Sequence, residues 1–183
     1  MFAIGLALAA APTAQSPTSQ SATWVAHDIN LNLYNLPRSY FCDELREKFR
    51  DVLLALGARP DLSVLTSRCE PGSRSPSVRV RFSMPEIIES AAKGGTVVEA
   101  SAALVRLEPG HPVSLEATDC ELLRQIKDGL LAPTSQHVTT FNLACSAPPS
   151  RWPRFSLSVR TLQALASGVR VADERDPPLK RLN

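Results

Sequence analysis

Four cysteines are the residues of this chain whose type and spacing most directly suggest chemistry. Cys42 and Cys69 lie in the first half, and Cys120 and Cys145 repeat nearly the same separation in the second. Four thiolates can hold zinc, but structural zinc sites usually take closely spaced pairs, and here no two cysteines are close in sequence. The spacing therefore favours one disulfide in each half, Cys42 with Cys69 and Cys120 with Cys145, and no metal site.

Histidines are the next candidates, because hydrolytic or metal chemistry needs at least one beside a nucleophile or other ligands. The chain has three, His27, His111 and His137, and none belongs to a known catalytic motif. The sequence also contains no GxSxG elbow, HExxH helix, phosphate-binding glycine loop or dinucleotide fingerprint. We therefore expect no catalytic residue and no cofactor. An enzyme with an unrecognised site stays an alternative, and it requires a pocket of polar groups from both halves near His27 or His137.

Paired acids could also act as a general acid and base. Asp43 with Glu44, and Asp119 with Glu121, are two such pairs. Both lie in the first turn of a predicted helix, where negative charge offsets the helix dipole, so we interpret them as structural.

The elements that position these residues follow the same order in each half. In the first half, period-two alternation predicts a strand over 24–33, Ser39 caps a helix that ends at Gly57, and strands follow at 62–69 and 77–83. In the second half, a strand at 96–108 precedes a helix that starts at Asp119 behind a Thr118–Glu121 capping box. Two more strands are predicted over 138–145 and 154–162.

The predicted fold class is therefore α+β, with two tandem β-α-β-β copies at 23–84 and 96–164. Each helix has one apolar stripe, so both should cover one face of a largely antiparallel sheet. Each disulfide should join the start of a helix to the end of the next strand, on its apolar side beside Leu65 or Leu143. The alternative to duplication is chance resemblance between two capped amphipathic helices, since identity between the halves is low.

Composition supports one globular domain, because 44% of the 183 residues are hydrophobic and 21% are charged. We expect a signal peptide and polar linker at 1–22, the domain at 23–166 and a charged flexible tail at 167–183. The apolar run at 2–11 is too short to span a bilayer. Because disulfides persist in oxidising compartments, the expected location is periplasmic or secreted.

The sheet face away from the helices is predicted to be polar and mildly basic. The net charge of only +2 makes nucleic acid an unexpected partner, and the aromatic residues of the strands fall on the helix-covered side. A solvated face with no partner is the alternative interpretation of this surface. The candidate binding residues are those of this face and an exposed loop: Arg79, Arg81, Asn142, Trp152 and Arg160.

These patterns predict an architecture and a compartment without indicating a reaction. The expected function is an exported, non-catalytic interaction module that binds a protein or a component of a bacterial envelope. The first alternative is a secreted inhibitor of an extracellular hydrolase, a role that small disulfide-linked scaffolds often fill. The enzyme described above is the second.

Overall fold

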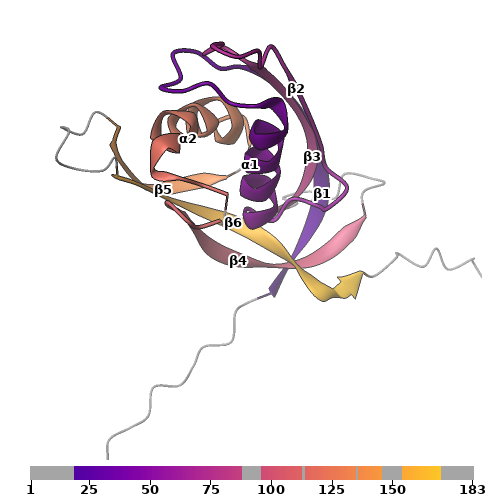
Figure 1. Cartoon of the computed structure of the whole chain (residues 1–183). Coiled ribbons are helices and arrows are strands. Elements are labelled where there is room, and N and C mark those ends of the chain that lie inside the picture. Colours follow the sequence, from indigo (N-terminus) through magenta and orange to yellow (C-terminus); the bar gives the residue numbers. More distant parts are fainter. Residues whose placement is uncertain (1–18, 88–95, 113, 135, 146–153, 170–183) are drawn as a thin grey trace, which may run out of the picture.

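The structure, a computed structural model, describes residues 19–87, 96–112, 114–134, 136–145 and 154–169. This part of the chain forms one six-stranded antiparallel sheet and two helices, which confirms the α+β class (Figure 1). The strands are β1 (Ser19–Asn32), β2 (Ser63–Ser67), β3 (Ser77–Ile87), β4 (Val97–Leu107), β5 (His137–Ala144) and β6 (Arg154–Val169). The helices are α1 (Cys42–Ala55) and α2 (Cys120–Ile126); the 3-10 turn η1 (Ala117–Asp119) precedes α2, and the π turn η2 (Lys127–Leu131) follows it.

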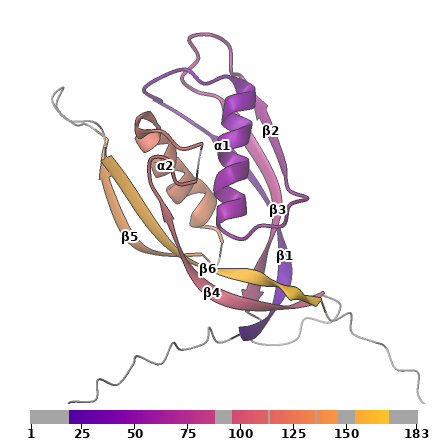
Figure 2. The ribbon, with the colours of Figure 1, turned by 60° about the horizontal axis from the view of Figure 1, so that its bottom comes forward.

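The strand order is β2-β3-β1-β4-β6-β5, so each half of the chain supplies three neighbouring strands. The halves meet where Ser19–Thr23 of β1 pairs with Val97–Ser101 of β4. Away from this short junction, β1 pairs only with β3, and β4 pairs only with β6. The sheet therefore curves around α1 and α2, which lie together on its inner side (Figure 2).

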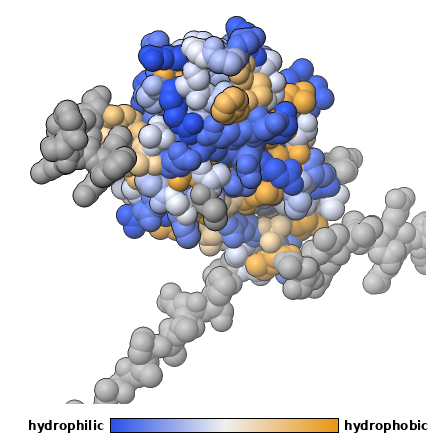
Figure 3. All heavy atoms as spheres, in the orientation of Figure 1, coloured by the Kyte–Doolittle hydropathy of each residue, from blue (hydrophilic) through white to orange (hydrophobic). Residues whose placement is uncertain are grey.

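One hydrophobic core runs through both halves. The apolar side chains of α1 and α2 pack against inward-facing residues of β3 and β6, as the two helical stripes predict. Its buried members on these elements include Leu45, Phe49, Val52, Val80, Phe82, Leu122, Leu123, Ile126, Phe155 and Leu157. Viewed from the helix side, the surface over this core is mainly hydrophilic, with apolar residues in small patches (Figure 3).

Both predicted disulfides are present. Cys42–Cys69 closes a separation of 27 residues and Cys120–Cys145 one of 25, with Cα–Cα distances of 5.3 and 5.4 Å. The predicted position of Leu65 beside Cys69 on the apolar side is wrong. Val64 pairs with the buried Val80, so Leu65 points to the opposite face and is 57% exposed.

Several boundaries also differ from the sequence expectations. Phe41, not Ser39, is the N-cap of α1, and it makes no side-chain capping bond. The capping box before α2 joins Glu116 and Asp119 instead of Thr118 and Glu121. The outer ends of β1 and β6 extend beyond the predicted strands because both pair with β4, the strand that connects the halves.

Candidate functional site

The outer face of the sheet, opposite α1 and α2, carries two arginines held by one carboxylate. In the β1–β3 register Asp28 lies opposite Arg81, and Arg79 is two residues away on the same face. Arg79 donates from Nε and Nη2 to the two Asp28 oxygens at 2.8 and 2.7 Å, and Arg81 donates from Nε at 3.1 Å. Hydrogen bonding from Arg79, supported by Arg81, lowers the pKa of Asp28 from 3.8 to about 2.

The same face continues along β2 and β3 with further ordered side chains. Arg68 donates to Asn32 Oδ1 at 2.8 Å and also contacts Ser77 Oγ, and Leu65 lies opposite Arg79 in the register. We call Asp28, Leu65, Arg68, Arg79 and Arg81 the arginine patch. It combines three guanidinium groups, one carboxylate and one exposed apolar side chain, so it is basic.

The structure separates the other predicted site residues from this patch. Arg160 lies on β6, and the strands β1 and β4 stand between it and β3. Asn142 lies on β5, in a shallow hollow of about 290 Å³ that Arg106 and Glu108 also line. Trp152 is outside the described residues. The structure therefore brings together Arg79 and Arg81, and it places Arg160 and Asn142 in two other hollows.

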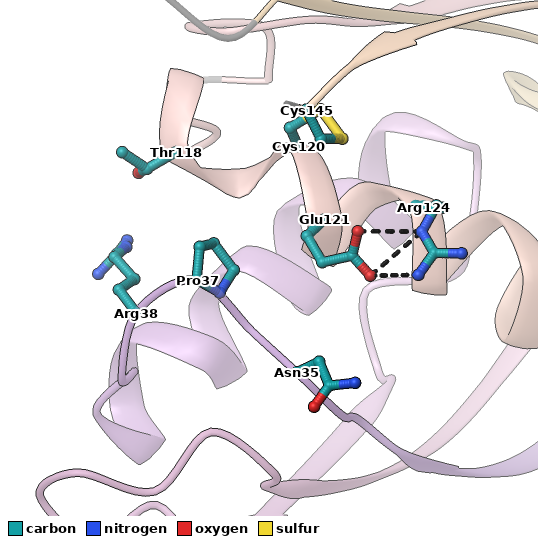
Figure 4. A pocket seen from close by; sticks show the side chains of 8 residues that line it. All are labelled: Asn35, Pro37, Arg38, Thr118, Cys120, Glu121, Arg124 and Cys145. Atoms are coloured by element: carbon teal, nitrogen blue, oxygen red, sulfur yellow. Dashed lines mark hydrogen bonds and ion pairs between the residues drawn. A yellow bond between two sulfur atoms is a disulfide. The ribbon is translucent and has the colours of Figure 1, made fainter. Parts of the chain in front are cut away.

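A pocket of about 440 Å³ lies between the loop before α1 and the start of α2 (Figure 4). We call it the Glu121 pocket. The loop supplies Asn35, Pro37 and Arg38, and the second half supplies Thr118, Cys120, Glu121, Arg124 and Cys145. Glu121 and Arg124 face each other as a two-pronged ion pair, and hydrogen bonding from Arg124 lowers the pKa of Glu121. Two of the charges at this pocket thus neutralise each other.

Arg38 connects the Glu121 pocket to a buried ionic network. Its guanidinium pairs with Glu44, lies 3.4 Å from Asp119 and stacks over the Tyr40 ring at 4.1 Å. Asp119 is fully buried and accepts hydrogen bonds from Tyr40 Oη and Lys48 Nζ, both at 2.8 Å. Burial, with the adjacent Asp119 carboxylate, raises the pKa of Tyr40.

The network joins the two halves of the chain, because Tyr40 and Lys48 come from the first and Asp119 from the second. Asp119 Oδ2 also accepts the backbone N–H of Glu116 at 2.8 Å, so the carboxylate has donors on both oxygens. Donors on both oxygens satisfy this buried carboxylate and hold the two halves in one arrangement.

A third pocket, of about 270 Å³, lies between the end of β3 and the strands β4, β5 and β6. We call it the Arg160 pocket. Its polar residues include Glu86 from the first half and Gln136, His137 and Arg160 from the second. Its apolar walls come from Pro85, Ile87, Ala102 and Leu162. The pocket therefore brings together polar groups of both halves beside His137. This is the kind of pocket that the alternative of an unrecognised enzyme site requires.

His27 lies next to this pocket on the inner side of β1. Its ring stacks on Phe82 with centroids 5.0 Å apart, and its Nε2 lies 3.2 Å from Glu86 Oε1. Glu86 was not among the residues predicted from sequence, and neither were Asp28 and Lys48. The sequence pattern could have indicated two of them. Asp28 lies on the same polar face of its strand as Asn30, and Lys48 interrupts the apolar stripe of α1.

Within the described ranges, no group of three or more His, Cys, Asp or Glu residues is placed to hold a metal ion. No helix of this part of the chain is both long enough and apolar enough to cross a bilayer. Comparisons with models of protein families, with curated proteins and with solved structures find no match. The proposal for the function is therefore based on the geometry of this chain alone.

Proposed function

We propose that this protein is a non-catalytic interaction module that binds a protein or an envelope component through the arginine patch. The observation that carries the proposal is the arrangement of Arg79 and Arg81 on Asp28. The two side chains are 47% and 57% exposed, yet their shared carboxylate holds them side by side. Side chains that are ordered before binding lose less entropy in a complex, and arginine is enriched in protein interfaces.

The chemistry of the patch favours a partner with acidic groups. Arg81 contacts Asp28 through Nε, so its contact with this carboxylate does not use its two terminal nitrogens. Guanidinium groups bind carboxylates and phosphates with paired hydrogen bonds, and Leu65 adds an apolar contact next to them. A protein surface that combines carboxylates with an apolar side chain matches this face.

The disulfides support a proposal for the compartment. Two disulfides are consistent with an oxidising environment, and we infer that the protein is exported to the periplasm or to the exterior. A rigid, cross-linked domain that presents a polar sheet face suits an interaction role there.

We also infer that the two halves arose by duplication of one β-α-β-β unit. In each half the first helical residue is a disulfide cysteine, Cys42 in α1 and Cys120 in α2. The strand order supports the same interpretation, because β2-β3-β1 and β5-β6-β4 occupy equivalent positions on the two sides of the sheet. Duplication explains why the two halves share the same strand order and the same cysteine position. Without duplication, both similarities would have arisen by chance.

The test is recovery of a partner from an envelope extract with immobilised full-length protein. The double variant Arg79→Gln/Arg81→Gln removes two charges from the arginine patch, and Arg106→Gln removes one from the other half of the same sheet. We expect a protein that is retained by the unmodified chain and by Arg106→Gln, and that is released by the double variant. Retention by all three proteins, or by none, would show that the patch is not the binding surface.

A further inference from the structure

We propose that the Arg160 pocket binds a small amphiphilic carboxylate, that is, a molecule with an apolar body that ends in one carboxylate group. This site goes beyond the proposed function, because it shares no residue with the arginine patch: it uses the far end of β3 together with β4, β5 and β6. It also does not require that the patch bind anything.

One end of the pocket is formed by the cationic Arg160 and by His137, which lie directly opposite each other in the β5–β6 register. Arg79, Arg81 and Arg106 on the strands of this sheet each contact a carboxylate. Arg160 has no carboxylate partner among the described residues. A guanidinium that the fold leaves uncompensated at a pocket wall favours an anion, and its planar geometry matches a carboxylate.

One further polar group of the pocket, the side-chain amide of Gln136, can donate a hydrogen bond to an anionic ligand. Within the described residues, the one partner of the Gln136 side-chain amide is a thioether, since its Nε2 lies 3.6 Å from Met84 Sδ. A thioether is a weak acceptor, so the fold does not commit this donor strongly. Glu86 is the one acid of the wall, and its carboxylate contacts His27, not Arg160.

Apart from Gln20 and Thr161, the rest of the wall is apolar and continues to the surface. Pro85, Ala102 and Leu162 line the pocket, and Ile87 at its rim is 57% exposed. Leu104, paired with Arg160 in the β4–β6 register, is 66% exposed and extends the apolar area. An apolar wall beside the guanidinium of Arg160 matches an apolar chain attached to a carboxylate. The volume of about 270 Å³ lies just below the ~300–1,000 Å³ of drug-sized ligand pockets, so it limits the ligand to a small one.

Calorimetric titration of the full chain with octanoate tests the proposal. Octan-1-ol has the same chain without the charge, and butyrate has the charge with a shorter chain. We expect octanoate to bind more tightly than either. N-acetyl-leucine, titrated in parallel, distinguishes an acyl-chain acid from the carboxyl end of a peptide, and the tighter of the two identifies the natural class.

Variants locate the binding. Arg160→Gln should weaken octanoate binding by about tenfold or more, because it removes a charge-assisted contact. Ala102→Phe should block binding by filling the pocket. Arg106→Gln, on the same sheet face outside the pocket, and Arg79→Gln/Arg81→Gln should bind like the unmodified chain, and thermal unfolding of each variant verifies its fold.

Three results would overturn the site. The first is no binding of either acid up to about 10 mM, which excludes even millimolar affinity. The second is equal binding of octanoate and octan-1-ol, and the third is an equal loss in Arg160→Gln and Arg106→Gln. Loss of octanoate binding leaves partner recovery through the arginine patch intact, so failure of this site and failure of the proposed function are separate outcomes.

Discussion

Asp28 and Asp119 are two carboxylates with opposite surroundings and opposite roles. Asp28 is 44% exposed and holds Arg79 and Arg81 on the outer face, where a partner could reach them. Asp119 is completely buried and neutralises Lys48, whose side chain is only 3% exposed. The first carboxylate therefore arranges a surface, and the second allows a buried cation to exist inside the core.

This difference predicts how the two kinds of acid respond to mutation. Asp119→Ala should lower the free energy of unfolding by about 3–5 kcal/mol, because it removes the nearest counter-charge of the buried Lys48, at 2.8 Å, and leaves the more distant Glu44 and Glu116 at 3.7 and 3.9 Å. Asp43→Ala is the matched control, since Asp43 is 89% exposed and its ion pair is the surface contact with Arg46, so its loss should cost less than about 1 kcal/mol. Urea denaturation measures both.

A double variant distinguishes the cost of an unpaired buried charge from the cost of lost packing at Asp119. Lys48→Met/Asp119→Leu removes both members of the buried pair, so it should be more stable than Asp119→Ala alone. If Asp119→Ala were no more destabilising than Asp43→Ala, the network would not hold the halves together.

The sequence predicted the position of Asp119 but not its contacts. Asp119 was expected in the first turn of a helix, and it does lie at the start of α2 in a capping box. Its burial and its bond to Lys48 were not predictable, because the two residues are 71 positions apart and no local pattern pairs them.

At the scale of elements, the end of α1 depends on Gly57. The sequence predicted that the helix stops there, and the structure places the last helical residue at Ala55, with Leu56 as the C-cap. Gly57 has φ +92°, and a Cβ at this position would lie 2.7 Å from the Leu162 carbonyl oxygen of β6. The glycine thus permits both the left-handed turn and the close approach of α1 to β6.

Gly57→Ala should therefore destabilise the fold by more than about 2 kcal/mol, since strain in the backbone adds to a backbone contact that cannot relax. Gly72→Ala is the control: Gly72 has φ +88° but open space around its Cα, so it should lose only about 1 kcal/mol. Thermal unfolding of both variants gives the difference. Equal losses would mean that the contact with Leu162 contributes nothing.

Strand parity was the most predictable property of the elements. The alternation in β3 and β6 placed Arg79, Arg81 and Arg160 on the face away from the helices, and the register agrees. Parity failed in β2, where Leu65 points outward, because a strand of five residues at the sheet edge has too few alternations to define its buried side.

At the scale of the whole molecule, each half contains one disulfide, and both halves contribute to one hydrophobic core. The chain-entropy model assigns about 3–4 kcal/mol to a disulfide that closes a separation of 27 or 25 residues. Cys42→Ser/Cys69→Ser and Cys120→Ser/Cys145→Ser should therefore lower the free energy of unfolding by nearly equal amounts. Equilibrium denaturation of both double variants measures this, and a loss below about 1 kcal/mol in one of them would contradict equivalent roles for the two bonds.

The sequence by itself determined the order of the elements, the disulfide pairing and the polarity of the open sheet face. These properties depend on local periodicity and on cysteine spacing, which one chain displays directly. Only the tertiary structure decided that β1 pairs with β4, that Lys48 meets Asp119, and that Glu86 shares a pocket with Arg160. Each of these contacts joins residues from different halves, so it depends on how the two halves pack and not on any pattern within either.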